Sequence, residues 1–328
     1  MWNFLIRINK KLIIAIPVMM AAGFVFGTTT NTDIVRSLKI LIMPFTFLMV
    51  YPMMVTLNIK HLKEGIHVPL QLTTQFINFA IIPFLAYFLG LIFFREQPYM
   101  ALGLLLASLL PTSGMTISWT GFAKGNMGAA INMTIIGLTL GSLATPFYVQ
   151  TLLGTTVDVN IYLVIKQIVL IVFIPMALGY ITRQILLKKY TMAVFKNSIA
   201  PRFPALSTLG VLGIVFVALA LKAETIAGNP AVLSAILAPL LILYGLNFLL
   251  GTLAGRIFFK RGDAIALVYG TVMRNLSIAL AIAINAFGPE GADAALVIAV
   301  SYIIQVQSAA WYVKLTDAIF GTPEPVTV

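Results

Sequence analysis

Long apolar stretches, separated by short clusters of polar and basic residues, run through nearly the whole sequence. A helix needs about 20 apolar residues to cross ~30 Å of hydrocarbon at ~1.5 Å per residue. Ten stretches have this length and character, and we expect a spanning helix in each: residues 12–28, 38–57, 69–94, 100–123, 127–153, 160–186, 204–221, 231–259, 264–287 and 291–313. The pattern therefore predicts an all-α polytopic membrane protein with ten transmembrane helices.

The composition agrees with a chain that faces the lipid bilayer, because 60% of the residues are hydrophobic and only 9% are charged. A soluble domain carries about 25% charged residues. The net charge of +11 does not indicate a nucleic-acid partner, since the basic residues lie in short loops between apolar stretches. Cysteine is absent, which excludes disulfides, thiolate metal sites and a cysteine nucleophile. His61 and His67 share a polar loop, which we interpret as interfacial rather than metal-binding.

Catalysis is not expected, because no histidine or carboxylate lies deep in a predicted span. We therefore predict no catalytic residue, no metal and no cofactor, and a protein that is not an enzyme.

The distribution of lysine and arginine predicts an orientation. Fifteen of the 21 lie at the ends of the chain or in one set of alternate loops, and four lie in the other set: Arg36, Lys39, Arg95 and Lys222. Cytoplasmic loops carry an excess of these residues. We expect both termini to be cytoplasmic, in the cytoplasmic (inner) membrane.

A weak internal repeat divides the chain. The first span contains IPVMMAAG from Ile16, and the sixth contains IPMALG from Ile174. Five spans per half is an odd number, so a duplicated half must insert upside down, as in many secondary transporters. We expect one five-helix repeat at residues 1–155 and a second, inverted one at 156–328.

The fourth span contains Pro-Thr-Ser-Gly at residues 111–114, near the middle of the membrane. Proline removes a backbone donor and clashes with the preceding turn, so the helix should break there. Irregular backbone at this depth belongs where it lines a cavity, and the N-terminus of the second half-helix favours an anion. The alternative is a packed proline kink without a function.

Arg274 lies at a similar depth in the ninth span. A charge there costs about 2.5–3.5 kcal/mol on insertion scales, so it needs a partner. Because none of the ten acidic residues lies deep in a span, the candidates are backbone carbonyls, water or a bound anion. A structural strut capped by carbonyls is the alternative. The uncharged polar residues of the spans are by default hydrogen-bonding contacts between helices: Gln75, Asn132, Thr134, Asn275, Gln305 and Gln307.

Several segments resemble one transporter superfamily. QFINFAIIPFLAY (from Gln75), LPTSGMTISWTGFAKGN (from Leu110) and MRNLSIALA (from Met273) are similar to the bile acid:sodium symporter and arsenite permease superfamily, which shares its fold with the plant PIN auxin exporters. MPFTFLMVYPMMV in the second span resembles the arsenite permease branch. The resemblance implies a panel domain of spans 1, 2, 6 and 7, and a core domain of spans 3–5 and 8–10, in which the broken helices 4 and 9 cross.

The same resemblance implies where sodium would bind. Oxygen ligands remain at five matching positions: Gln75, Thr116, Asn132, Thr134 and the Met273 carbonyl. Four other positions differ from the residues of the sodium symporters. Ile117 stands in place of an asparagine, Ala130 of a serine, Gly270 of the central glutamate and Arg274 of a glutamine. The cysteine of span four and the glutamate of span nine that are expected in arsenite permeases are also missing.

Together these features predict a secondary active transporter that moves a small organic anion or oxyanion by alternating access, with sodium coupling altered or lost. Two alternatives are an arsenite or oxyanion efflux permease that works without cysteine, and a sodium-coupled symporter of the bile acid type. We expect the substrate to contact Thr112, Ser113, Gly114, Thr116, Arg274 and Asn275, and the protein to be a monomer or a homodimer.

Overall fold

The computed structural model describes residues 11–56, 67–157, 159–228 and 230–322, and every regular element in these ranges is a helix. Seven helices are long and apolar enough to cross a membrane: Thr32–Thr56, Val68–Phe93, Met127–Leu153, Ile161–Lys189, Met192–Glu224, Ala231–Phe258 and Gly291–Phe320. Shorter apolar helices cover Ile14–Thr29, Pro98–Leu109 and Leu276–Ala286. The predicted all-α polytopic membrane class is confirmed at this level.

The described helices follow the apolar stretches of the sequence. Those before residue 155 are α2 (Leu12–Thr29), α3 (Thr32–Ser37), η1 (Leu38–Leu41), α4 (Ile42–Thr56), α5 (Val68–Phe76), η3 (Ile77–Ile81), α6 (Ile82–Phe93), α7 (Pro98–Leu109), α8 (Gly114–Phe122) and α9 (Met127–Leu153). Those after it are α10 (Ile161–Ile168), η4 (Val169–Phe173), α11 (Ile174–Lys189), α12 (Met192–Val194), η5 (Phe195–Ile199), α13 (Arg202–Gly228), α14 (Ala231–Phe258), α15 (Arg261–Val272), α16 (Leu276–Ala286) and α17 (Gly291–Phe320).

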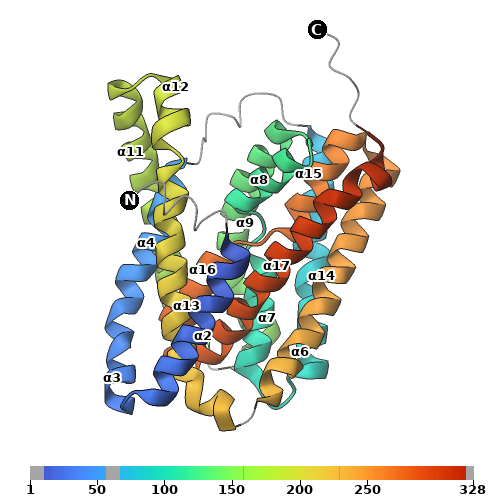
Figure 1. Cartoon of the computed structure of the whole chain (residues 1–328). Coiled ribbons are helices and arrows are strands. Elements are labelled where there is room, and N and C mark those ends of the chain that lie inside the picture. The colour runs from blue at the N-terminus through green and yellow to red at the C-terminus, as the bar shows by residue number, and fades with distance from the viewer. Residues whose placement is uncertain (1–10, 57–66, 158, 229, 323–328) are drawn as a thin grey trace.

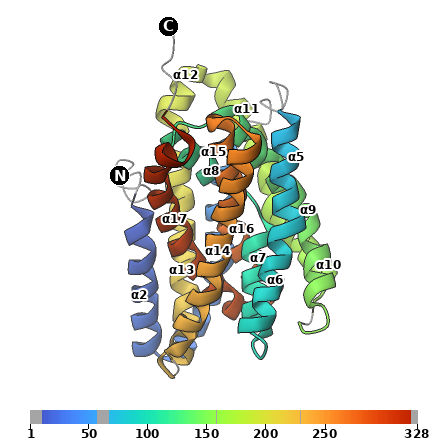
Figure 2. The same ribbon diagram turned by 90° about the vertical axis from the view of Figure 1, so that its right-hand side faces the viewer.

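The helices form two groups with a shared centre. The helices α2, α4, α11 and α13 pack together on one side, and α6, α14 and α15 lie on the other, with α7, α16 and α17 between them (Figure 1). In the perpendicular view, α9 and α10 lie along one edge of the bundle (Figure 2). Small residues bring the first group close together, because a Cβ added at Gly27 of α2 would lie 2.3 Å from the Ala220 carbonyl oxygen of α13.

Two apolar stretches are interrupted. The helix α7 ends at Leu109 and α8 begins at Gly114, while α15 ends at Val272 and α16 begins at Leu276. The interruption expected from Pro111 is therefore present, and a second one occurs at Arg274. Each half-helix is too short to cross the bilayer alone, which is why neither stretch is among the seven long helices.

One end of the bundle is held by polar contacts. Arg261 of α15 donates hydrogen bonds to the carbonyls of Ala123, Lys124 and Gly321 and pairs with Asp317. The helix α17 extends to Phe320, beyond the apolar stretch that was expected to end near residue 313, and Asp317 in this extension makes one of these contacts. His67 Nδ1 lies 2.9 Å from Asp263 Oδ2, which fits the interpretation of an interfacial loop; His61 lies outside the described residues.

Candidate functional site

The two interruptions cross each other and share backbone hydrogen bonds. The Thr112 N–H donates to the Met273 carbonyl at 2.7 Å, and the Asn275 N–H donates to the Leu110 carbonyl at 2.8 Å. Pro111 and Arg274 thereby face each other in an isolated antiparallel bridge. Unpaired backbone groups are costly in hydrocarbon. Each break supplies the partners that the other one needs, so the crossing is a fixed unit rather than two independent kinks.

Thr112 holds the first break in a strained conformation. Its φ is +66°, a left-handed value that is unusual for a β-branched residue. The side chain is fully buried, and its hydroxyl lies 3.3 and 3.2 Å from the carbonyls of Met133 and Thr134 on α9. The following helix α8 starts with a capping box, in which the Ser113 N–H donates to the Thr116 hydroxyl and the Met115 N–H donates to the Ser113 hydroxyl.

Gln305 of α17 fixes the second break. Its Oε1 accepts the Arg274 N–H at 2.8 Å, and its Nε2 donates to the Arg274 carbonyl at 3.2 Å. The Tyr244 hydroxyl of α14 donates to the same Oε1. The Asn275 Oδ1 then caps α16 by accepting the Ile278 N–H. Gln305 is thus a contact between helices, as expected from its type, and it determines where the Arg274 side chain begins.

The Arg274 guanidinium is enclosed and unpaired. Only 3% of the residue is exposed, and both terminal nitrogens, Nη1 and Nη2, lack a hydrogen-bond partner among the described residues. The side chain borders a cavity of about 10 Å³, together with Ile82, Ala107, Ser108, Leu243, Tyr244 and Asn247. The Asn247 Oδ1 is also buried and unpartnered. A volume of this size holds one water-sized particle. The cavity therefore combines an uncompensated cation with one unpartnered amide oxygen, that of Asn247.

The expected substrate residues fall into two places. Thr112, Ser113 and Thr116 form the start of α8 beside α9, and Asn275 caps α16, with its Nδ2 buried and unpartnered. None of these residues, nor Gly114, lines the cavity at Arg274. The guanidinium is directed toward α6, α7 and α14 instead.

The residues expected to bind a cation differ in whether their polar atoms are already hydrogen-bonded. The Met273 carbonyl accepts the Thr112 N–H, and the Thr134 hydroxyl is 3.5 Å from the Ser113 carbonyl. Gln75 and Asn132 each carry buried amide atoms without hydrogen-bond partners in the described part of the chain. Oxygen atoms thus remain near the first break, although several already take part in hydrogen bonds.

Comparison of the whole sequence with known proteins identifies the family of this chain. Residues 43–229, more than half of the 328-residue chain, match the model of the Sodium Bile acid symporter family. The chain belongs to this family. It is 26% identical over 288 residues to the arsenical-resistance protein Acr3 of Alkaliphilus metalliredigens (strain QYMF), an alignment that covers 83% of this chain and 79% of the relative.

Two relatives from Bacillus subtilis (strain 168) have similar sequence identity to this chain. The uncharacterized protein YbaS is 24% identical over 232 residues, covering 70% of this chain and 74% of the relative. The uncharacterized sodium-dependent transporter YocS is 26% identical over 257 residues, an alignment that covers 76% of this chain and 75% of the relative. Together with the apolar helices, membership of the Sodium Bile acid symporter family makes this chain an integral membrane transporter.

Within this family framework, the surroundings of Gly270 are unusual. A Cβ added at Gly270 would lie 2.6 Å from the Met133 sulfur and 3.3 Å from the Thr74 methyl group. Gly270 occupies the position where the sequence resemblance places a glutamate, so a thioether fills the space that a carboxylate side chain would need. Hard cations such as sodium prefer several oxygen ligands, and a thioether is a poor substitute.

Three polar residues of the Arg274 cavity were not anticipated from the sequence: Ser108, Tyr244 and Asn247. Each is an ordinary polar residue in an apolar helix, and none carries a charge that would mark it. Tyr244 and Asn247 are three residues apart on α14, which places them on one helix face. Such a polar pair facing inward is the only sequence signal that could have identified them.

Proposed function

We propose that this member of the Sodium Bile acid symporter family transports a small anion by alternating access, with Arg274 taking the place of a coupling sodium ion. The observation that supports the proposal most directly is the buried, unpaired guanidinium at the crossing of the two helix breaks. A buried charge without a partner is strongly destabilising. Binding of an anion would compensate that charge, and arginine can hold a carboxylate or oxyanion through two parallel hydrogen bonds.

The proposal includes an opening step. The cavity of about 10 Å³ is too small for an anion of several atoms. In the alternating-access scheme, α6, α7 and α14 would separate from Arg274 in another conformation, and the anion would then contact the guanidinium together with Asn247 and Ser108.

The proposed architecture has ten spans in two inverted five-helix repeats, residues 1–155 and 156–328. Supporting it, seven long apolar helices are joined by the shorter helix Ile14–Thr29 and by two interrupted stretches, α7–α8 and α15–α16. The two interruptions cross in antiparallel fashion, as expected for equivalent elements of inverted repeats. The panel would be built around α2, α4, α11 and α13, and the core around the crossing.

Two other functions belong to the same transporter class. Similarity to a protein named for arsenical resistance favours an arsenite or oxyanion efflux permease, although the cysteine-free chain offers no thiolate, the soft ligand that such a function would use. Similarity to a protein described as sodium-dependent favours a sodium-coupled symporter, although Met133 fills the space above Gly270.

A ligand panel separates these possibilities. We expect small carboxylates, sulfonates or oxyanions such as acetate, lactate, methanesulfonate, phosphate and arsenate to raise the melting temperature of the purified protein, since a ligand that binds the folded state stabilises it by mass action. The shift should be the same in sodium and choline buffers. Arsenite is tested alongside these anions, and stabilisation by arsenite alone would support the efflux permease. Saturable stabilisation by low-millimolar sodium, with potassium inert, would contradict the proposed sodium independence.

The proposed orientation places both termini in the cytoplasm. The cysteine-free sequence allows single cysteines to be introduced without background. Thr155 follows α9 and Tyr190 follows α11, and both are exposed. In intact cells, we expect Thr155→Cys to react with a membrane-impermeant maleimide, whereas Tyr190→Cys should react only after the membrane is opened. The reverse pattern would overturn the orientation.

A further inference from the structure

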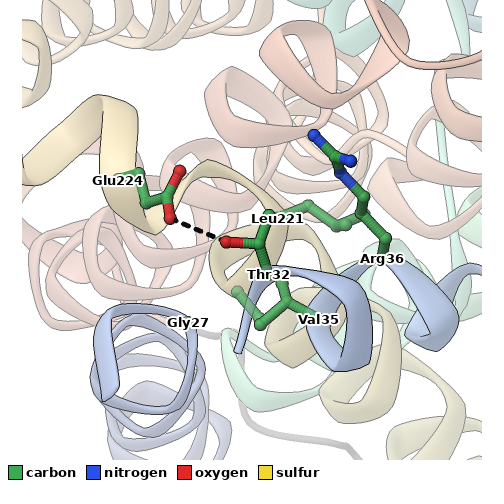
Figure 3. A pocket seen from close by; sticks show the side chains of 7 residues that line it. Gly27, Thr32, Val35, Arg36, Leu221 and Glu224 are labelled. Carbon is green, nitrogen blue, oxygen red and sulfur yellow. Dashed lines mark hydrogen bonds between the residues drawn. The ribbon is translucent and has the colours of Figure 1, made fainter. Parts of the chain in front are cut away.

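A second cavity, of about 130 Å³, lies at the end of the bundle where α2, α3 and α13 meet. It is lined by Gly27, Thr32, Val35, Arg36, Ala220, Leu221 and Glu224. Its apolar wall is formed where α2 and α13 touch at Gly27 and Ala220. Polar groups border the cavity as well, as Figure 3 shows: the Thr32 hydroxyl points to the Glu224 carboxylate, and Arg36 lies on the other side of Thr32.

The two charged residues of this cavity are available for a ligand. The Thr32 hydroxyl donates to Glu224 Oε1 at 3.2 Å, which leaves the rest of the carboxylate free. Arg36 and Glu224 do not pair with each other, and Arg36 has no side-chain partner in the ranges that the structure describes. The nearby Lys222 is already paired with Asp293 at 2.8 Å, so it does not neutralise Glu224. A cation and an anion therefore face one cavity without compensating each other directly.

This arrangement suits a ligand that carries both charges. The arginine fork matches a phosphate group, and a carboxylate accepts hydrogen bonds from a primary ammonium. Phosphoethanolamine combines these two groups on a two-carbon spacer. Phosphocholine has the same phosphate and the same net charge, but its quaternary nitrogen has no N–H donor. The cavity should therefore discriminate between the two through Glu224.

The position of the cavity indicates a lipid as the source of this group. Thr32 follows the end of α2, and Glu224 lies in the last turns of α13, so the cavity is at the ends of apolar helices, where headgroups lie. Val25, Ile34 and Ile40, on the helical segments α2, α3 and η1, are 57%, 53% and 79% exposed, and acyl chains can pack against such apolar side chains. A soluble zwitterion would gain nothing from this apolar surface.

We propose that the cavity bounded by Arg36, Thr32 and Glu224 is a binding site for the headgroup of phosphatidylethanolamine, with the phosphate at Arg36 and the ammonium at Glu224. The site is separate from the Arg274 cavity and does not depend on the proposed transport function.

Lipid titration of the purified full-length protein tests the site. Binding of phosphatidylethanolamine and phosphatidylcholine with identical acyl chains is measured by native mass spectrometry in detergent. We expect the ethanolamine lipid to bind about 1.5- to fivefold more tightly, a range set by the modest strength of solvent-exposed charge pairs. Glu224→Gln should remove this preference, because the amide keeps the size of the side chain but not its charge. Arg36→Gln should weaken both lipids alike.

Lys39→Gln is the matched control, because Lys39 is a neighbouring exposed cation that does not line the cavity, and the preference should persist in it. Equal binding of the two lipids by the parent protein, or a preference that survives Glu224→Gln, would overturn the proposal. Glycerophosphoethanolamine, which has no acyl chains, should compete only weakly. Competition as strong as that of the lipid would overturn the assignment to a lipid.

Discussion

Replacing Arg274 with glutamine should strongly weaken stabilisation by anions while making the ligand-free protein more stable. The guanidinium is 3% exposed, and its terminal nitrogens have no hydrogen-bond partner among the described residues, so its charge is a cost without a ligand. A charge-assisted contact is worth about 1.5–3 kcal/mol, so anion affinity should fall about ten- to hundredfold. Melting temperatures of parent and variant, each titrated with the anion that stabilises the parent most, measure both effects.

Two further variants make this result specific. Arg274→Lys keeps the charge without the planar fork and should retain weak anion binding. Lys166→Gln removes an exposed cation from α10 and should leave the anion response unchanged. If Arg274→Gln lowers the stability of the ligand-free protein and leaves anion affinity intact, Arg274 is a structural strut and the proposed role is wrong.

Replacing Gly141 with a larger residue should destabilise the crossing of the two helix breaks. A Cβ at this position of α9 would lie 2.7 Å from the Pro111 Cδ and 2.9 Å from the Leu109 carbonyl oxygen, both in or next to the first break. Overpacking of this kind costs about 1–3 kcal/mol. We expect Gly141→Ala to lower the melting temperature by roughly 1–5 °C.

Gly128 on the same helix provides the control. Among the described residues, apart from its chain neighbours and the backbone of its own helix, a Cβ at Gly128 would meet only the Asn126 Oδ1 within 4 Å, at 3.4 Å. Alanine is the better helix former by about 1 kcal/mol, so Gly128→Ala should keep or raise the melting temperature. Equal effects of the two substitutions would show that close packing against the break does not limit stability.

The helices were largely predictable, because apolar length is a direct consequence of the thickness of the bilayer. The interruption at residues 110–113 was also predictable, since Pro111 cannot continue the hydrogen-bond ladder. The end of α17 was not predictable from apolar length, because its last turns are polar, and the pairing of Asp317 there with Arg261 joins residues far apart in the sequence.

For the candidate site, the sequence identified Arg274 but not its surroundings. Its depth and its lack of an acidic partner could be derived from spacing and composition alone. The direction of its side chain depends on Gln305, which holds the backbone from another helix, and this orientation places the guanidinium beside Ser108 and Asn247 rather than at the start of α8. Similarly, the change at Gly270 was visible in the sequence, but the occupation of that space by Met133 depends on tertiary packing.

The most direct test of the account is anion uptake into proteoliposomes in buffer without sodium. The anion used is the one that stabilises the parent protein most. Uptake by the parent is compared with uptake by Arg274→Gln at equal amounts of protein in the liposomes. We expect the parent to take up the anion at the same rate in choline and in sodium buffer, and the variant to show no uptake above that of empty liposomes. Uptake that requires sodium, or that persists in Arg274→Gln, would contradict the claim that Arg274 replaces the coupling ion.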